Sequence, residues 1–201
     1  MPFSRRILLV DDDPSIRAVA QMMLAARGFD VQTAENGFEA LLALRGALPD
    51  IIITDLKMPH MSGFELLSIV RKRFPQIPTI AISGEYNGTR PLGLITDAFF
   101  TKANYKPEQL FERIADLITA SPLRANPAKA EYAPVWLPRS STGYIVLTCT
   151  ECLRSFSVPS EHGFDDEVHE TECIFCDSPV RYLIERSSDP PPAKKKLREK
   201  A

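Results

Sequence analysis

The sequence has no apolar run long enough to cross a membrane. A spanning helix needs about 18 consecutive apolar residues, whereas the apolar stretch behind the basic N-terminus covers only residues 7–10 and ends at three aspartates. The same stretch is too short for the apolar core of a secretory signal peptide. We therefore expect a cytoplasmic protein without a membrane partner.

An excess of charge of either sign is also missing. The 24 basic and 26 acidic residues leave a formal net charge of −2, which gives the whole chain no general attraction for nucleic acid. Cysteines number only four. Because thiols stay reduced in the cytoplasm, these four favour a metal site over disulfides.

The first 120 residues contain a repeated alternation of short apolar runs and segments with helical periodicity. Such runs are typical of parallel strands that are buried on both faces. Five predicted strands that alternate with helices indicate an α/β fold with a doubly wound, five-stranded parallel sheet. We expect the strands at residues 7–10, 31–34, 51–54, 79–82 and 98–101, and a short or irregular helix between the last two.

The remainder of the chain divides into three parts by composition. Residues 121–141 are rich in Pro, Ala and Ser and hold the only tryptophan, which predicts a linker between two domains. Residues 142–186 carry strand-like segments and paired cysteines, and we expect them to form a second domain with a separate core. Residues 187–201 are predicted to be a disordered basic tail, and the first domain is assigned to residues 1–120.

Polar residues follow four of the predicted strands. Because ligands bind beyond the carboxyl ends of the strands in an open α/β sheet, we expect these side chains to converge at one rim. They are Asp11, Asp12 and Asp13 after the first strand, Asp55 after the third, Ser83 after the fourth and Lys102 after the fifth.

The combination of these groups fits phosphoryl transfer. Clustered carboxylates repel one another unless a cation lies between them, and Mg²⁺ suits oxygen ligands. Lys102 and Ser83 supply a cation and a hydroxyl for phosphoryl oxygens on Asp55, and such transfer needs mainly positioning and charge neutralisation. The alternative is an ordinary α/β domain whose loop acids are simply solvated.

Three ordered blocks carry a family resemblance over about residues 4–120. The block ILLVDDDPSIR (residues 7–17) resembles the first strand and acidic loop of response-regulator receivers. ITDLKMPHMSG (residues 53–63) is similar to the segment around their phosphoacceptor, and TIAISG (residues 79–84) to the strand that ends in their switch hydroxyl. The resemblance implies a flavodoxin-like fold and a two-component phosphoprotein that a histidine kinase or a phosphotransfer protein phosphorylates. It implies no enzyme activity beyond slow self-dephosphorylation.

The resemblance also implies a role for each matching residue. Asp55 would be the phosphoacceptor, and the Mg²⁺ ligands would be Asp11, Asp12, Asp55 and the backbone carbonyl of Lys57. Ser83 would be the switch hydroxyl, Phe99 the switch aromatic and Lys102 the phosphoryl-sensing lysine. Asp13 matches a position that the family leaves variable.

The sequence departs from the family pattern after the fifth strand. Receivers usually have Lys-Pro there, whereas Ala103 follows Lys102, and a Lys-Pro pair occurs only at Lys106-Pro107. We prefer Lys102 as the sensing lysine because it directly follows the apolar strand. A receiver that is never phosphorylated remains the alternative to an active one.

The four cysteines form two CxxC pairs, Cys149 with Cys152 and Cys173 with Cys176, with 20 residues between the pairs. This spacing fits a four-cysteine zinc site, and the segment resembles a zinc ribbon of about 45 residues. So small a unit has little core, so the metal would supply much of its folding free energy. Iron in a rubredoxin-like site, disulfides and a redox pair are the alternatives. Two histidines between the pairs, His162 and His169, and His60 are expected to be surface residues.

The charge of the ribbon decides between two kinds of partner. Residues 142–186 contain nine acidic and three basic residues, a net charge of −6, which disfavours nucleic acid because binding to it depends on neutralising phosphates. We therefore expect an unknown protein target, with the ribbon as an output or accessory module. The alternative is a DNA-binding transcriptional regulator that uses the ribbon and the basic tail.

Overall fold

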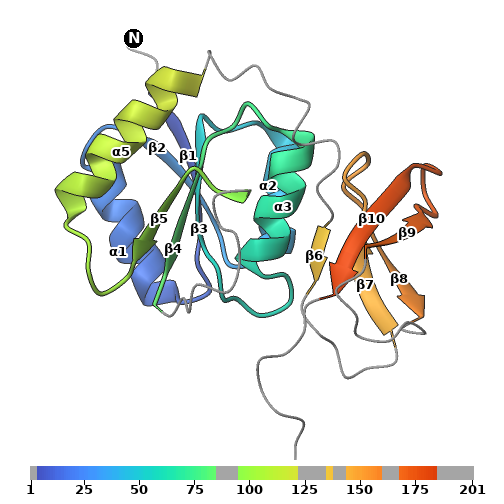
Figure 1. Ribbon diagram of the computed structural model, residues 1–201. Helices are drawn as coiled ribbons and strands as arrows, with labels where there is room; N and C mark the ends of the chain where they lie inside the picture. The colour runs from blue at the N-terminus through green and yellow to red at the C-terminus, as the bar shows by residue number, and fades with distance from the viewer. Residues whose placement is uncertain (1–3, 85–94, 122–134, 138–143, 160–167, 185–201) are drawn as a thin grey trace, which may run out of the picture.

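The computed structural model describes residues 4–84, 95–121, 135–137, 144–159 and 168–184. Five parallel strands form a sheet in the order β2-β1-β3-β4-β5. Figure 1 shows helices α1 and α5 on one face of this sheet and α2 and α3 on the other. The strands are β1 (Arg6–Val10), β2 (Asp30–Ala34), β3 (Ile51–Asp55), β4 (Thr79–Ser83) and β5 (Ala98–Thr101), and the helices are α1 (Pro14–Ala25), α2 (Gly37–Gly46), α3 (Gly63–Arg73) and α5 (Pro107–Ala120).

This architecture confirms the predicted fold class, because the strand order is that of flavodoxin-like sheets. The expected irregular helix between β4 and β5 falls on residues 85–94, which lie outside the described residues. Among the described residues, no helix combines the length and the apolar character that crossing a membrane requires.

The two faces of the sheet bury different side chains of the same strands. In β3, Ile51 and Ile53 belong to the apolar cluster under α1 and α5, whereas Ile52 belongs to the cluster under α2 and α3. All five residues of β3 are buried. The continuous apolar runs in the sequence therefore arise because both faces of the sheet are covered by helices.

Side chains just before the helices satisfy the free amide groups of the first turns. The Asp13 carboxylate accepts hydrogen bonds from the amides of Ser15 (2.7 Å) and Ile16 (3.2 Å) at the start of α1. At the start of α3, Ser62 and Glu65 form a capping box, in which each side chain accepts from the amide of the other residue. These caps fix where the helices begin relative to the ends of the strands.

The C-terminal part of the described chain is a small β-rich unit. Strand β10 (Pro179–Ile184) pairs in parallel with β6 (Val135–Leu137) and antiparallel with β9 (His169–Glu172). Strands β7 (Tyr144–Thr148) and β8 (Ser155–Pro159) form an antiparallel hairpin. Strand β6 lies within residues 121–141, the segment predicted to be a linker, and its Val135 and Leu137 are only 1% and 3% exposed.

The small unit does not have a core of its own, contrary to our expectation. Strand β6 lies beside α3 in Figure 1, and one apolar cluster continues from β1, α2 and α3 into the ribbon. The physical reason is that α3 is covered on both sides, because its first eight residues, Glu65 and Ser68 among them, are all buried. Members of the shared cluster include Leu44, Leu66, Ile69, Val70, Val135, Leu137, Ile145, Leu147, Val180 and Tyr182.

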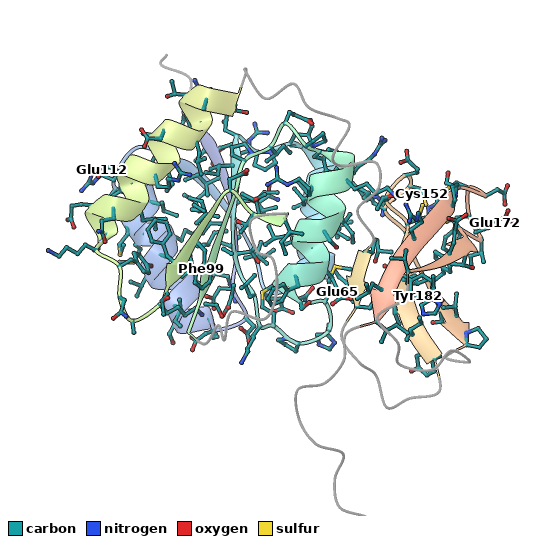
Figure 2. All side chains as sticks on the ribbon, viewed as in Figure 1. Glu65, Phe99, Glu112, Cys152, Glu172 and Tyr182 are labelled. Carbon is teal, nitrogen blue, oxygen red and sulfur yellow. The ribbon has the colours of Figure 1, made fainter. Side chains whose placement is uncertain are left out.

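Glu65 is a buried carboxyl group in the first turn of α3, and Figure 2 labels it beside β6. It is 5% exposed, and its Oε2 accepts hydrogen bonds from the Ser62 amide (2.9 Å) and the Ser62 hydroxyl (3.0 Å). Burial raises the pKa of Glu65 from 4.5 to about 7, although the bonds from Ser62 oppose this shift. Glu65 therefore prefers to be protonated in the folded chain at mildly acidic pH.

Replacing Glu65 by glutamine should remove a pH dependence of stability. The unfolded chain loses the Glu65 proton near pH 4.5 and the folded chain near pH 7, so the wild type loses stability between these values as the pH rises. Glutamine keeps the capping box without the charge. Glu65→Gln should therefore be more stable than wild type at pH 8, by up to about 3 kcal/mol relative to pH 4.5. Urea unfolding at both pH values measures this difference.

Glu39 provides a matched control, because it occupies the equivalent position of α2 but is exposed. Glu39→Gln should change the free energy of unfolding by the same small amount at both pH values. An equal effect of Glu65→Gln at pH 4.5 and pH 8 would contradict the assignment of the buried charge.

Candidate functional site

An acidic pocket lies at the carboxyl ends of the central strands. Asp11 follows β1, Asp55 is the last residue of β3, and Lys102 follows β5 directly. The Lys102 ammonium donates to Asp11 Oδ2 (2.9 Å) and to Asp55 Oδ2 (2.6 Å). One carboxylate oxygen each from Asp11, Asp12 and Asp55 lies within 4.8 Å of the others. The structure therefore brings together the three carboxylates and the lysine that the sequence singled out.

The charges in the pocket are partly buried and only partly balanced. Burial raises the pKa of Asp11, and the contact with Lys102 opposes the shift. Burial also works to lower the pKa of Lys102, but hydrogen bonds to Asp55 and Asp11 outweigh it, so the pKa is raised. Lys102 thus stays charged and neutralises one of three carboxylates. The remaining negative charge and the all-oxygen ligand set suit a hard divalent cation such as Mg²⁺.

The loop after β3 is held against the phosphoacceptor candidate, Asp55. The amide of Lys57 donates to Asp55 Oδ1 (3.2 Å), and the amide of Gly63 donates to the Leu56 carbonyl (3.1 Å). A Cβ atom on Gly63 would lie 1.9 Å from the Asp55 carbonyl oxygen and 2.9 Å from Leu56 Cα. Only glycine allows α3 to start this close to the backbone of Asp55. Gly63 was not among the candidates from the sequence, although the Ser62-x-x-Glu65 capping signature beside it marks the start of a helix there.

The two candidate switch residues lie on β4 and β5. Ser83 ends β4, is 1% exposed, and its carbonyl accepts from the Lys102 amide (3.0 Å). Phe99 pairs with Ala81 across the sheet and packs, half-buried, on an apolar cluster that includes Leu56. Figure 2 labels Phe99 on β5. Both residues therefore contact elements that border Asp55.

The other candidates lie outside the acidic cluster. Lys106 is exposed and precedes α5, where its amide donates to Gln109 Oε1 (2.9 Å). Asp13 caps α1, and bonds from the amides of Ile16 and Ser15 lower its pKa. His60 is exposed in the loop after β3. Of the two lysines left open by the sequence, the structure places Lys102 on the carboxylates.

The four cysteine sulfurs form a compact cluster that fits a tetrahedral metal ion. All four lie within 4.8 Å of one another, with Cys149 Sγ 3.6 Å from Cys176 Sγ and Cys152 Sγ 3.7 Å from Cys173 Sγ. A tetrahedral zinc site with Zn–S bonds of about 2.3 Å requires sulfurs about 3.8 Å apart. The cysteines are not disulfide-bonded. The cluster can therefore hold a metal ion, whose identity the sulfurs alone do not fix.

The two CxxC turns have the same backbone geometry. In the first, the amide of Leu153 donates to the Cys149 carbonyl (2.9 Å), and in the second, that of Asp177 donates to the Cys173 carbonyl (2.9 Å). Leu153 and Asp177 both have positive φ angles, 55° and 58°. The amides of Glu151 and Phe175 each point at the first sulfur of their pair, at 3.4 Å. Such amide–sulfur contacts stabilise thiolates, as expected of metal ligands.

The four thiols differ in environment. Burial raises the pKa of the Cys149 thiol to about 12, whereas hydrogen bonding with Ser178 lowers the pKa of the exposed Cys176 to about 6. Without a metal, Cys149 is therefore protonated at neutral pH, and metal binding must displace its proton. His169 lies instead against the Tyr182 ring, with 5.4 Å between ring centroids. His162 lies outside the described residues.

Comparison with known proteins covers mainly the first part of the chain. The family model described as response regulator receiver domain matches residues 7–115. NtrC of Salmonella typhimurium, a DNA-binding transcriptional regulator, is 42% identical over 77 residues, which cover 38% of this chain and 16% of NtrC. The alkaline phosphatase synthesis transcriptional regulatory protein PhoP of Bacillus subtilis is 31% identical over 125 residues, which cover 61% of this chain and 52% of PhoP. The chain thus spans about half or less of these relatives.

Solved structures agree with this match. A CheY-like receiver domain protein of Methanospirillum hungatei has a TM-score of 0.57 and 27% identity, with 61% of this chain and 100% of that chain covered. The response regulator TrrA of Thermotoga maritima, in complex with Mg²⁺ and BeF, has a TM-score of 0.53 and 31% identity. That alignment covers 56% of this chain and 98% of TrrA.

Removing the metal ligands should destabilise both parts of the chain. Purified protein should carry about one zinc per chain, and Cys149→Ser should unfold the ribbon. Because the ribbon shares its core with α3, the receiver should also lose roughly 2–4 kcal/mol of its free energy of unfolding. This is about what the burial of one or two large apolar side chains contributes. Elemental analysis measures the metal, and amide hydrogen exchange of β3 measures the loss of stability.

Ser157→Ala, at an exposed position of β8, is the matched control and should behave as wild type. Protein purified under reducing conditions with neither zinc nor iron would contradict the four-thiolate site. Unchanged exchange in β3 of Cys149→Ser would show that the shared core contributes little to the receiver.

Proposed function

Because the chain belongs to the response regulator receiver domain family of two-component signalling, we propose that it accepts a phosphoryl group on Asp55 from a histidine kinase or a phosphotransfer protein. The observation that carries this proposal is the Lys102 ammonium, which bridges Asp55 and Asp11 at 2.6 and 2.9 Å. A partly buried lysine held by two carboxylates is ready to pair with a new anionic group on one of them.

The groups around Asp55 support a defined division of roles. A carboxylate oxygen of Asp55 attacks the phosphorus, the P–N bond to the donor imidazole breaks, and the electron pair returns to that nitrogen. Mg²⁺ at Asp11, Asp12, Asp55 and the Lys57 carbonyl would neutralise charge on the phosphoryl oxygens. The Lys57 amide, 3.2 Å from Asp55 Oδ1, orients the carboxylate, while Lys102 exchanges its bond to Asp55 for one to the phosphoryl group.

The response to phosphorylation is proposed to pass through Ser83 and Phe99. Ser83 is joined to Lys102 by the backbone bond between its carbonyl and the Lys102 amide (3.0 Å). A hydroxyl at this strand end can donate to a phosphoryl oxygen, and Phe99 packs on the cluster that contains Leu56, the neighbour of Asp55. Movement of β4 toward the phosphoryl group would therefore change the packing of Phe99.

The ribbon is proposed to hold zinc and to serve as an accessory or output module that contacts a protein. Its net charge of −6 over residues 142–186 supports a protein partner rather than nucleic acid. The free thiols suit a reducing compartment, so we propose the cytoplasm. The relatives named as transcriptional regulators match the receiver, so the alternative of DNA binding through the ribbon and basic tail gains no support from them. Salt-dependent DNA binding by the full chain would support this alternative.

Asp55→Asn should abolish phosphorylation. A small phosphodonor with a magnesium salt should add one phosphoryl group to the wild type, and asparagine keeps the shape but removes the nucleophile. Phosphate-affinity electrophoresis measures the product. Asp13→Asn is the control, because Asp13 caps α1 and lies outside the acidic cluster; it should be labelled like wild type. Equal labelling of Asp55→Asn would refute the proposal.

Lys102→Ala should separate phosphorylation from the conformational response. The variant should still accept phosphate slowly but should lose the chemical-shift changes that beryllofluoride, a phosphoryl mimic, causes in the wild type. Lys106→Ala should respond nearly as wild type, because Lys106 is exposed before α5. The TrrA complex with Mg²⁺ and BeF shows that the mimic binds a relative. Loss of the response in Lys106→Ala, with a normal response in Lys102→Ala, would reverse the assignment.

A further inference from the structure

A groove lies between α2 and the CxxC turns of the ribbon, on a part of the surface that the acidic pocket does not use. It has a volume of about 400 Å³, which lies within the range of ligand-binding clefts. One wall is a stripe of α2, formed by Phe38, Leu41, Leu42 and Arg45. These positions follow the i, i+3, i+4, i+7 spacing of one helix face, so the wall is about 10 Å long.

The opposite wall comes from the ribbon. Leu153 of the first CxxC turn and Phe175 of the second line it, together with Arg154. The groove exists only because the ribbon is packed on the receiver, since neither part supplies both walls. Leu42 is 65% exposed and Phe175 is 46% exposed. Two large apolar side chains that face each other across a groove and remain open to water indicate a surface for a partner.

The charges at the groove indicate the chemistry of that partner. Arg45 and Arg154 both line it, and within the described part of the chain neither guanidinium forms an ion pair with a carboxylate. By contrast, Arg73 pairs with Glu151 (3.4 Å) and Arg181 with Glu170 (3.9 Å). Arg154 is one of only three basic residues of the ribbon, beside nine acidic ones, and its guanidinium lies over the Phe175 ring, 5.4 Å from the ring centroid. The groove is therefore an apolar, positively charged site on an otherwise acidic unit.

We propose that this groove binds an acidic, amphipathic peptide segment of another protein. Apolar side chains of the segment insert between Leu42 and Phe175, and flanking carboxylates pair with Arg45 and Arg154. In this mode of recognition, apolar side chains anchor the peptide in the groove, and the charge pairs fix the orientation of the peptide. The basic tail at residues 187–201 is a poor occupant, because the arginines repel it. The proposal rests on the groove and is independent of phosphorylation of Asp55.

A random peptide library displayed on phage, selected against the full zinc-loaded chain, tests the proposal. The enriched peptides should combine apolar residues with Asp or Glu. Binding of these peptides, measured by fluorescence anisotropy, should weaken at least tenfold in Leu42→Glu and in the double variant R45E/R154E. The double variant should also bind better to versions of the peptides in which Lys replaces the acidic residues.

Met22→Glu is the matched control, since Met22 is 70% exposed on α1, away from the groove. It should bind the peptides like wild type, and thermal unfolding should show all variants folded. The proposal is overturned if no peptide is enriched, if basic peptides are enriched, or if Leu42→Glu binds like wild type. It is also overturned if Leu42→Glu dissociates a dimer, or if Lys194→Glu shifts the resonances of the groove methyl groups, since the occupant is then a second copy or the tail.

Discussion

Burial of helix α3 on all sides is the constraint on which the rest of the structure depends. Its first eight residues are all buried, so this part of the helix has no face that could meet water. Leu66, Ile69 and Val70 belong to the cluster that continues into the ribbon, while Phe64 and Leu67 pack with Ala81 of the sheet. Even the polar Glu65 and Ser68 of this segment are buried, at 5% and 1% exposure, so other parts of the chain cover it on every side. Without the ribbon, one side of α3 would be exposed to water. In the structure, β6 and its neighbouring strands cover that side.

The same helix begins at the phosphoacceptor candidate, which gives the ribbon a physical connection to the acidic pocket. Gly63 lies so close to the backbone of Asp55 that no side chain fits between them. Met61, just before the helix, is 2% exposed and belongs to the cluster that the ribbon shares. The loop after Asp55 and the ribbon therefore share part of their packing. The ribbon is better described as an additional layer packed on the receiver than as an independent domain.

Local signals in the sequence were sufficient for the sheet and for most of the pocket. Each buried strand is a short apolar run, and the groups at the strand ends could be placed together because parallel strands end at one rim. The CxxC spacing likewise predicted the sulfur cluster. The shared core could not be predicted from spacing, because it depends on contacts between distant segments. The apolar triplet at β6 is too short to stand out in a Pro-rich segment. Glu65 and Ser68, one helical turn apart in FELLSIV, look like the solvent-facing stripe of an ordinary surface helix, so the sequence contains no signal that α3 is covered on a second side.

The residue after Lys102 departs from the pattern that the family usually has. Where receivers usually have a proline after this lysine, the chain has Ala103, and two backbone hydrogen bonds form in the turn around it. The Lys102 amide donates to the Ser83 carbonyl (3.0 Å), and the Asn104 amide donates to the Thr101 carbonyl (2.9 Å). The first bond continues the pairing of β4 with β5, in which Ser83 faces Thr101. The register of β5 therefore directs the Lys102 ammonium to Asp55 (2.6 Å), whereas Lys106 of the Lys-Pro pair is exposed before α5.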